Sequence, residues 1–146
     1  MNTKTLLAAL AGAVAAFFLG WLLFGNLLMP FYSAHTIQYE GLMKDMEQPA
    51  GSMLVLIFIA NFCWSLAIAL VCSWSAMTGI MKGAVIGGTL GFLLQLSFDL
   101  FMYSTMNMYD GTLVIVDVLV NAAFSAVIGA IIGWVMARGG NKAAAA

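Results

Sequence analysis

Four long apolar runs constrain the fold of this chain more than any other feature. They cover approximately residues 5–29, 52–74, 81–103 and 112–137, and each is near or above the ~20 residues that a helix needs to cross a bilayer. With 64% hydrophobic and only 8% charged residues in a chain of 146, little polar surface is left to cover a water-soluble globule. We therefore predict an all-α integral membrane protein, a bundle of four transmembrane helices forming a single domain over residues 1–146.

The charged residues predict how this bundle lies across the membrane. Lys4, Lys82 and Arg138 fall at the N-terminus, the second connection and the C-terminus, which an even number of crossings places on one side. Because cytoplasmic loops are enriched in Lys and Arg, we expect both termini in the cytoplasm of a bacterial cell, with the bundle in its inner membrane. The net charge of -1 and the lack of a basic patch give no sign of a nucleic-acid partner.

The connection over residues 30–51 is the one stretch with ordinary soluble composition, and we expect it on the outer side. Within it, apolar residues recur at helical spacing beside charged ones, which predicts a short amphipathic helix at the membrane surface. The apolar positions are Tyr39, Leu42, Met43 and Met46. Gly41, in the middle, weakens such a helix by about 1 kcal/mol relative to Ala.

Shared spacings in the two halves of the chain predict a pair of pseudo-repeated helical hairpins. Three residues of the second run match three of the fourth in type and spacing: Asn61, Ser65 and Trp74 match Asn121, Ser125 and Trp134. Both hairpins would enter and leave the membrane on the cytoplasmic side, as in a parallel internal repeat.

Small residues at every fourth position predict where helices pack closely. Glycines in this pattern let two helix backbones approach, which substitutes for the hydrophobic drive that is missing inside a bilayer. The candidate packing residues are Gly12, Gly20, Gly83, Gly87, Gly91, Gly129 and Gly133. The rows in the third and fourth runs mirror each other about a turn near Met108, so an antiparallel hairpin would bring glycine level with glycine. The pattern leaves open whether these contacts form within one chain or between chains.

Two carboxylates, Asp99 and Asp117, lie inside the third and fourth apolar runs at mirrored positions. A charge at the bilayer centre costs about 2.5 to 3.5 kcal/mol on insertion scales, and Asp is too short to reach the interface as Lys does. We therefore expect both acids to face the bundle, a partner or a wet crevice. Amides at comparable depth are available to them, namely Gln95, Asn121 and Asn61.

Two interpretations of these acids stay open. Neighbouring carboxylates repel each other, and a shared proton or a bound cation would relieve that repulsion, which favours a proton or cation site open to the outside. Alternatively, the acids are neutral and hydrogen-bonded, or they reach the headgroup zone. A four-residue step also drifts by about 40° per turn, so the glycines and the acids need not share a helix face.

Methionines and the only histidine suggest a further metal hypothesis on the outer side. Thioethers are soft ligands suited to Cu(I), although Met also fills gaps in adaptable surfaces. The candidate copper ligands are Met43, Met46, Met102, Met106, Met108 and His35.

The sequence gives little support for an enzymatic function. No phosphate-binding loop, nucleophile motif or Cys/His metal spacing is present, so we expect no catalytic residues and no cofactor. Cys63 and Cys72 would lie ~13 Å apart along one helix, which is too far for a disulfide, since its α-carbons must lie within ~7 Å of each other.

The opening Met1-Asn2, the stretch from Gly20 to Gly25 and the four-crossing plan resemble a family of small bacterial inner-membrane proteins of unknown function. This resemblance implies a bacterial membrane protein and no particular functional residues.

Three functions compete on the sequence alone. The first is a non-catalytic membrane protein that packs through its small-residue helix faces, either as a homo-oligomer or as an accessory subunit of a larger membrane complex. The second is a small proton- or cation-linked transporter using Asp99 and Asp117. The third is an outer-surface Cu(I)-binding protein.

Overall fold

The computed structural model describes residues 2–39 and 50–138, and over these residues the secondary structure is helical with short connections. Four stretches are long and apolar enough to cross a membrane, which confirms the prediction of four candidate spans. The helices are α1 (Thr3–Leu22), a π-helical turn η1 (Leu23–Leu27), α2 (Met29–His35), α3 (Gly51–Trp74), α4 (Ile80–Thr105) and α5 (Gly111–Arg138). The predicted surface helix around Leu42, Met43 and Met46 lies outside the described residues.

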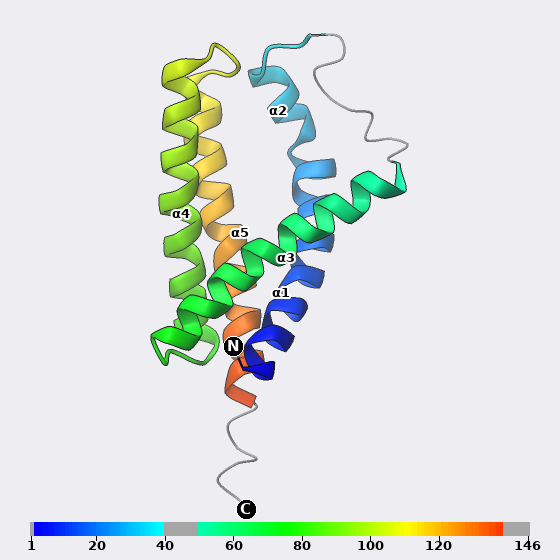
Figure 1. Cartoon of the computed structure of the whole chain (residues 1–146). Coiled ribbons are helices and arrows are strands. Elements are labelled where there is room, and N and C mark those ends of the chain that lie inside the picture. The colour runs from blue at the N-terminus through cyan, green and yellow to red at the C-terminus, as the bar shows by residue number, and fades with distance from the viewer. Residues whose placement is uncertain (1, 40–49, 139–146) are drawn as a thin grey trace, which may run out of the picture.

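The four long helices form two antiparallel pairs (Figure 1). α4 and α5 lie side by side along nearly their whole length and make the most extensive helix contact in the described structure, whereas α3 crosses α1 obliquely. α1 also packs on α5, which joins the pairs. The core lies where α1, α3 and α5 meet, and it is built of small and branched residues: Ala8, Ala9, Ala16, Ile68, Ala69, Cys72, Ile128 and Ile132. Alanine on α1 lets the three backbones approach closely enough for isoleucine to fill the space between them.

Glycine determines how closely α4 and α5 approach. A Cβ atom added to Gly83 would collide with the backbone carbonyl of Gly129, and one added to Gly87 would lie 3.0 Å from the Gly129 Cα. At the start of α4, Gly79 has a φ of 112°, which favours glycine, and its N–H donates to the carbonyl of Gly133 at 2.9 Å. The two helices thus pack in the mirrored register, with glycine facing glycine.

The glycines of α1 have less uniform surroundings. An added Cβ at Gly12 would lie 2.8 Å from the side chain of Ile132 and 3.1 Å from the Ser65 hydroxyl, so close packing there requires glycine. At Gly20 the nearest atom belongs to Phe124 at 3.9 Å, which is ordinary van der Waals contact. The close glycine contacts described by the structure all lie within one chain.

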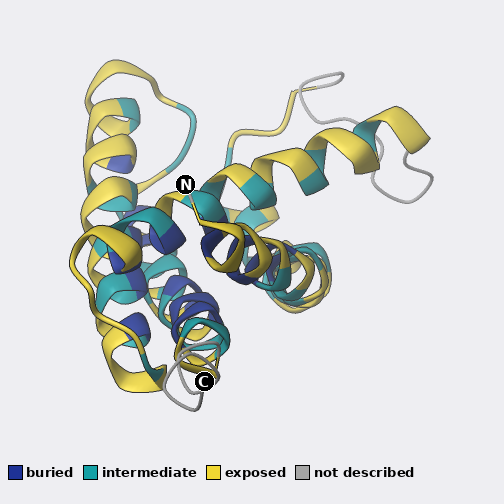
Figure 2. Ribbon diagram, turned by 60° about the horizontal axis from the view of Figure 1, so that its bottom comes forward, coloured by how far each residue is buried: buried dark blue, intermediate teal, exposed yellow. Residues whose placement is uncertain are grey.

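The first half of α3 extends away from the bundle and is exposed. Its buried residues, Ser65, Ile68, Ala69 and Cys72, all belong to its second half, and Figure 2 shows the opposite end reaching outward with an exposed surface. That surface is apolar, with Leu56 64% and Val55 59% exposed. Lipid tails are as apolar as these side chains, so a bilayer covers such a surface without cost.

A short helix that the sequence analysis did not anticipate extends the first span. After Leu22 the backbone widens into η1, and α2 comes next with Pro30 in its first turn, where its missing N–H leaves no intrahelical bond unmade. Figure 1 shows α2 continuing toward the turn between α4 and α5, at the end of the bundle away from both termini. We call this the distal end. Seven residues are too few for a periodic pattern to reveal, which is why the sequence indicated only a connection there.

Candidate functional site

The two membrane acids meet at the distal end through a single amide. Gln95 stands one turn before Asp99 on α4, and its Nε2 donates to Oδ1 of Asp99 at 2.9 Å and to Oδ2 of Asp117 on α5 at 2.5 Å. Asp99 is only 4% exposed, and Asp117 is partly buried. The helical drift therefore does not separate the acids, and Gln95 bridges them.

The glycine register of α4 and α5 explains why the acids are level with each other. Gly91, one turn before Gln95, lies against Ser125 and the carbonyl of Asn121, which an added Cβ would approach to 2.8 Å. Asn121 in turn donates from Nδ2 to Oδ1 of Asp117, one turn earlier on α5, and to its main-chain carbonyl, both at 3.0 Å. The close backbone approach at the glycines thus continues directly into the polar contacts.

Tyr32 on α2 completes the group by donating its hydroxyl hydrogen to Oδ1 of Asp117. Burial, and then the hydrogen bond to the negative Asp117, raise the pKa of Tyr32 far above its usual value, so the hydroxyl keeps its proton. The sequence analysis did not single out this tyrosine, so its contact with the acid is a finding of the structure. No sequence signal marked it, because Tyr32 lies beyond the first apolar run, in a segment whose approach to α5 depends on the tertiary structure. We call Tyr32, Gln95, Asp99, Asp117 and Asn121 the acid cluster.

Two buried polar atoms near the acid cluster have no hydrogen-bond partner among the described residues: Oδ2 of Asp99 and the hydroxyl of Tyr109. Tyr109 lies in the turn between α4 and α5. Its pKa is raised first by burial and then by the negative charges of Asp99 and Asp117, so its hydroxyl lies within electrostatic reach of both acids. Buried polar groups are normally hydrogen-bonded, so these two atoms mark a place where a proton or a ligand would complete the hydrogen bonding.

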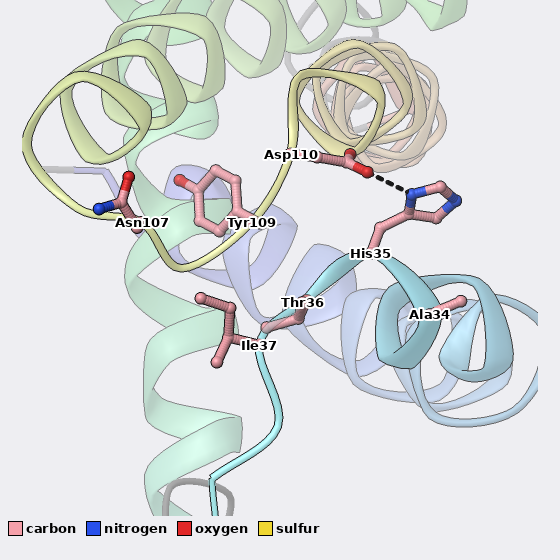
Figure 3. A pocket seen from close by; sticks show the side chains of 7 residues that line it. All are labelled: Ala34, His35, Thr36, Ile37, Asn107, Tyr109 and Asp110. Atoms are coloured by element: carbon pink, nitrogen blue, oxygen red, sulfur yellow. Dashed lines mark hydrogen bonds and ion pairs between the residues drawn. The ribbon is translucent and has the colours of Figure 1, made fainter.

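An open pocket of about 330 Å³ lies at the distal end (Figure 3). It is formed by the segment after α2 and the α4–α5 turn, which a backbone bridge between Thr36 and Tyr109 holds together. Its lining residues are Ala34, His35, Thr36, Ile37, Asn107, Tyr109 and Asp110. We call it the distal pocket. Tyr109 belongs to its wall and is also within electrostatic reach of both acids.

His35 and Asp110 make the contact drawn in Figure 3, with Nδ1 of His35 2.7 Å from Oδ2 of Asp110. Oδ1 of Asp110 also accepts the N–H of Leu113 at 2.9 Å, near the start of α5. The hydrogen bond from His35 is the largest cause that lowers the pKa of Asp110, and the Leu113 N–H adds to it. This pair fastens α2 to the first turn of α5.

Other candidate residues lie elsewhere. Asn61 donates to the carbonyl of Ile57 on its own helix, α3, at 2.9 Å, and so is not part of the acid cluster. Of the proposed copper ligands, Met43 and Met46 lie outside the described residues, whereas His35 is engaged by Asp110. Met102, Met106 and Met108 belong to the end of α4 and the turn after it. Within residues 2–39 and 50–138, no group of three or more His, Cys, Asp or Glu side chains is arranged to hold a metal ion.

Comparisons with known proteins give no further guide to this site. No protein-family model matches the chain, and neither curated proteins nor solved structures contain a significant match. The resemblance to bacterial inner-membrane proteins stays an expectation from the sequence.

Proposed function

We propose that this protein is a small proton- or cation-linked transporter whose exchangeable ion is held at the acid cluster. The observation that carries the proposal is the bridging of two membrane-buried acids by Gln95, with one oxygen of Asp99 buried and unpartnered among the described residues. Ionisable groups within membrane spans are expensive, and they commonly mark ion pathways and proton relays. The protein needs no catalytic residue for this role.

The charge balance of the cluster supports an exchangeable ion. Tyr32, Gln95 and Asn121 supply neutral donors, and no lysine or arginine of the described chain forms an ion pair with either acid. Two ionised carboxylates held this close repel each other in a medium of low dielectric constant. A proton or cation is the partner that removes this repulsion, and its loss and uptake would be coupled to movement of the surrounding helices.

The distal pocket is the proposed entrance for the ion. The distal pocket is open and shares Tyr109 with the surroundings of the acids. If the termini are cytoplasmic, as the positions of Lys4, Lys82 and Arg138 favour, this end faces the outside of the inner membrane. An ion would then enter from the outer side and reach acids that lie within the outer part of α4 and α5.

A thermal-unfolding experiment tests the proposal. The full-length protein, Asp99→Asn and Asp117→Asn are unfolded in lipid nanodiscs from about pH 4 to pH 9, the range over which perturbed carboxyl groups titrate, and with added Li⁺, Na⁺, K⁺ or Mg²⁺. We expect the parent to respond to pH or to one cation and both variants to lose that response. Asn61→Ala removes a polar side chain from another span, outside the acid cluster, and as the control it should keep the response.

Current recordings on a solid-supported membrane test transport directly. A rapid jump in proton or cation concentration should displace charge in the parent and not in Asp99→Asn. If Asp99→Asn and Asp117→Asn both respond like the parent at every pH and with every cation, the acid cluster has no ion-binding role and the proposal is wrong.

A second candidate function is the non-catalytic assembly role, as a homo-oligomer or an accessory subunit of a larger complex. The favouring observation is the exposed apolar half of α3, because the close glycine contacts that the structure describes are already used within the chain. A partner would therefore pack on α3. Native mass spectrometry of Val55→Trp and Leu56→Trp tests this role. If it is correct, the parent carries a stoichiometric partner or a second copy, and the substitutions release it.

A further inference from the structure

We infer that the ion at the acid cluster is a proton, that Asp99 carries it, and that Asp117 remains the ionised member of the pair. This inference rests on the proposed function and specifies its ion. It comes from the unequal hydrogen bonding of two acids that are otherwise alike in chemistry and depth.

Asp117 has the hydrogen bonds of an ionised carboxylate. Its Oδ1 accepts from Tyr32 and from Asn121, and its Oδ2 accepts from Gln95, so three side-chain donors surround one carboxyl group. An ionised carboxylate is an acceptor only, and donors aimed at it stabilise the charged form.

Asp99 has the opposite environment. It receives one side-chain hydrogen bond, from Gln95 to Oδ1, and its Oδ2 is buried without a partner among the described residues although the residue is only 4% exposed. Burial without donors disfavours the charged form of a carboxyl group, whereas a protonated carboxyl group brings an O–H donor of its own. The proton is therefore expected on Oδ2 of Asp99.

The contact between the two acids also requires one proton. Nε2 of Gln95 lies 2.9 Å from Oδ1 of Asp99 and 2.5 Å from Oδ2 of Asp117, so one amide holds the two carboxyl groups near each other. Two ionised carboxylates have no hydrogen to share, so such a contact is repulsive until one acid is protonated. A proton on Asp99 removes this repulsion.

The same geometry disfavours a metal ion between the acids. Gln95 Nε2 lies 2.9 Å from one carboxylate and 2.5 Å from the other, so its N–H hydrogens occupy the position from which a cation would bridge them. The remaining neighbours of Asp117 also present hydrogens, from Asn121 and Tyr32. Hard cations such as Ca²⁺ require about six to eight oxygen ligands, which this donor-rich cluster does not offer.

Of the titratable groups around Asp99, the two acids are the ones expected to change charge over the pH range of the experiments. The groups that face Asp99 are Asp117 on α5, Tyr32 on α2 and Tyr109 in the α4–α5 turn, and the described parts of α1 and α3 add no charged group beside it. Both tyrosines keep their protons because burial and the nearby acids raise their pKa values. A proton gained or lost at the cluster is therefore exchanged by the acid pair.

Infrared difference spectroscopy between low and high pH tests the inference on the full-length protein in lipid. A protonated carboxyl group absorbs in a region that is separate from ionised carboxylates, and the parent minus variant spectrum isolates one residue. We expect the band of a buried protonated carboxyl group in the parent, its loss in Asp99→Asn, and its retention in Asp117→Asn. Asp99→Glu should restore a shifted band, which separates loss of the group from loss of the fold.

Three results would overturn the inference in different ways. A band that persists in Asp99→Asn and disappears in Asp117→Asn would reverse the assignment of the two acids. A parent without any such band, but stabilised by Na⁺ or another metal cation, would retain the proposed function with a different ion. A parent that responds neither to pH nor to any cation would contradict both the inference and the proposed function.

Discussion

Tyr32 donates a hydrogen bond to Asp117 across 85 residues of sequence. This bond joins α2 to α5, two helices that otherwise make few contacts with each other. A short helix after a π-helical turn is thereby attached to the acid cluster at one point and, through His35 and Asp110, to the start of α5 at a second. π-Helical turns are frequent at functional sites, and here the turn directly precedes the helix that carries Tyr32.

Replacing Tyr32 by Phe removes one donor from Asp117 and leaves the ring in place. Hydrogen bonds to charged groups contribute about 1.5 to 3 kcal/mol, so we expect the free energy of unfolding to fall by an amount in this range. Tyr103→Phe is the control, since Tyr103 is half exposed at the same end and has no described hydrogen bond to an acid. Equal stability of Tyr32→Phe and the parent in nanodiscs would contradict the assigned contact.

Alanine at Gly83 or Gly129 should separate α4 from α5. Each added Cβ would collide with a backbone carbonyl of the opposite helix, which cannot move aside as a side chain can. Overpacking of this kind typically costs about 1 to 3 kcal/mol, and here it should also weaken the Gln95 bridge by displacing the acids. The measurement is the unfolding midpoint together with the pH response of the cluster.

Gly20→Ala is the matched control for these two variants. Its Cβ would meet only Phe124 at 3.9 Å, so we expect an unchanged or slightly raised midpoint. A loss of stability as large as that of Gly83→Ala would show that any glycine substitution in a span is harmful, and that the close contact is not the cause.

The pair formed by His35 and Asp110 should stabilise the protein at neutral pH and not at acidic pH. The pKa of Asp110 is lowered by His35 and by the Leu113 N–H. A carboxyl group whose pKa is lowered by folding stabilises the protein at pH values above its ordinary pKa. This contribution is lost as the pH falls through the lowered pKa of the folded state. Asp110→Asn keeps an oxygen for the Leu113 N–H and removes the charge, so its midpoint should lie below that of the parent at neutral pH and converge with it on acidification.

His35→Gln provides the check on this explanation. It removes the largest cause of the lowered pKa and should reproduce most of the effect of Asp110→Asn. Parallel pH profiles of the parent and Asp110→Asn would show that the pair does not contribute to stability.

Ser125 and Trp64 should be energetically coupled across α3 and α5. The indole N–H of Trp64 donates to the Ser125 hydroxyl at 3.1 Å. Hydrogen bonds between membrane helices contribute about 0.6 kcal/mol on average and up to about 1.7 kcal/mol. A double-mutant cycle with Ser125→Ala and Trp64→Phe measures this coupling, and additive effects of the two substitutions would contradict it.

Much of the acid cluster could be predicted from the sequence, because its chemistry depends on local spacing. Gln95 and Asp99, like Asp117 and Asn121, are four residues apart on one helix and thus neighbours on its surface. The mirrored glycines indicated the register that brings the two pairs together. Tyr32 and Tyr109 could not be predicted, because their positions depend on how short segments outside the spans fold back over the ends of α4 and α5.

The apolar runs were enough to locate the four candidate spans, since uninterrupted apolar segments are most stable in hydrocarbon, where a helix satisfies every backbone polar group. Which helix faces meet could be learned only from the packed bundle. Small changes in crossing angle and rotation accumulate along a span, so the spacing alone did not decide whether Asp99 and Asp117 face each other. The close backbone contact of Gly83 with Gly129 restricts that rotation, and one amide then joins the acids.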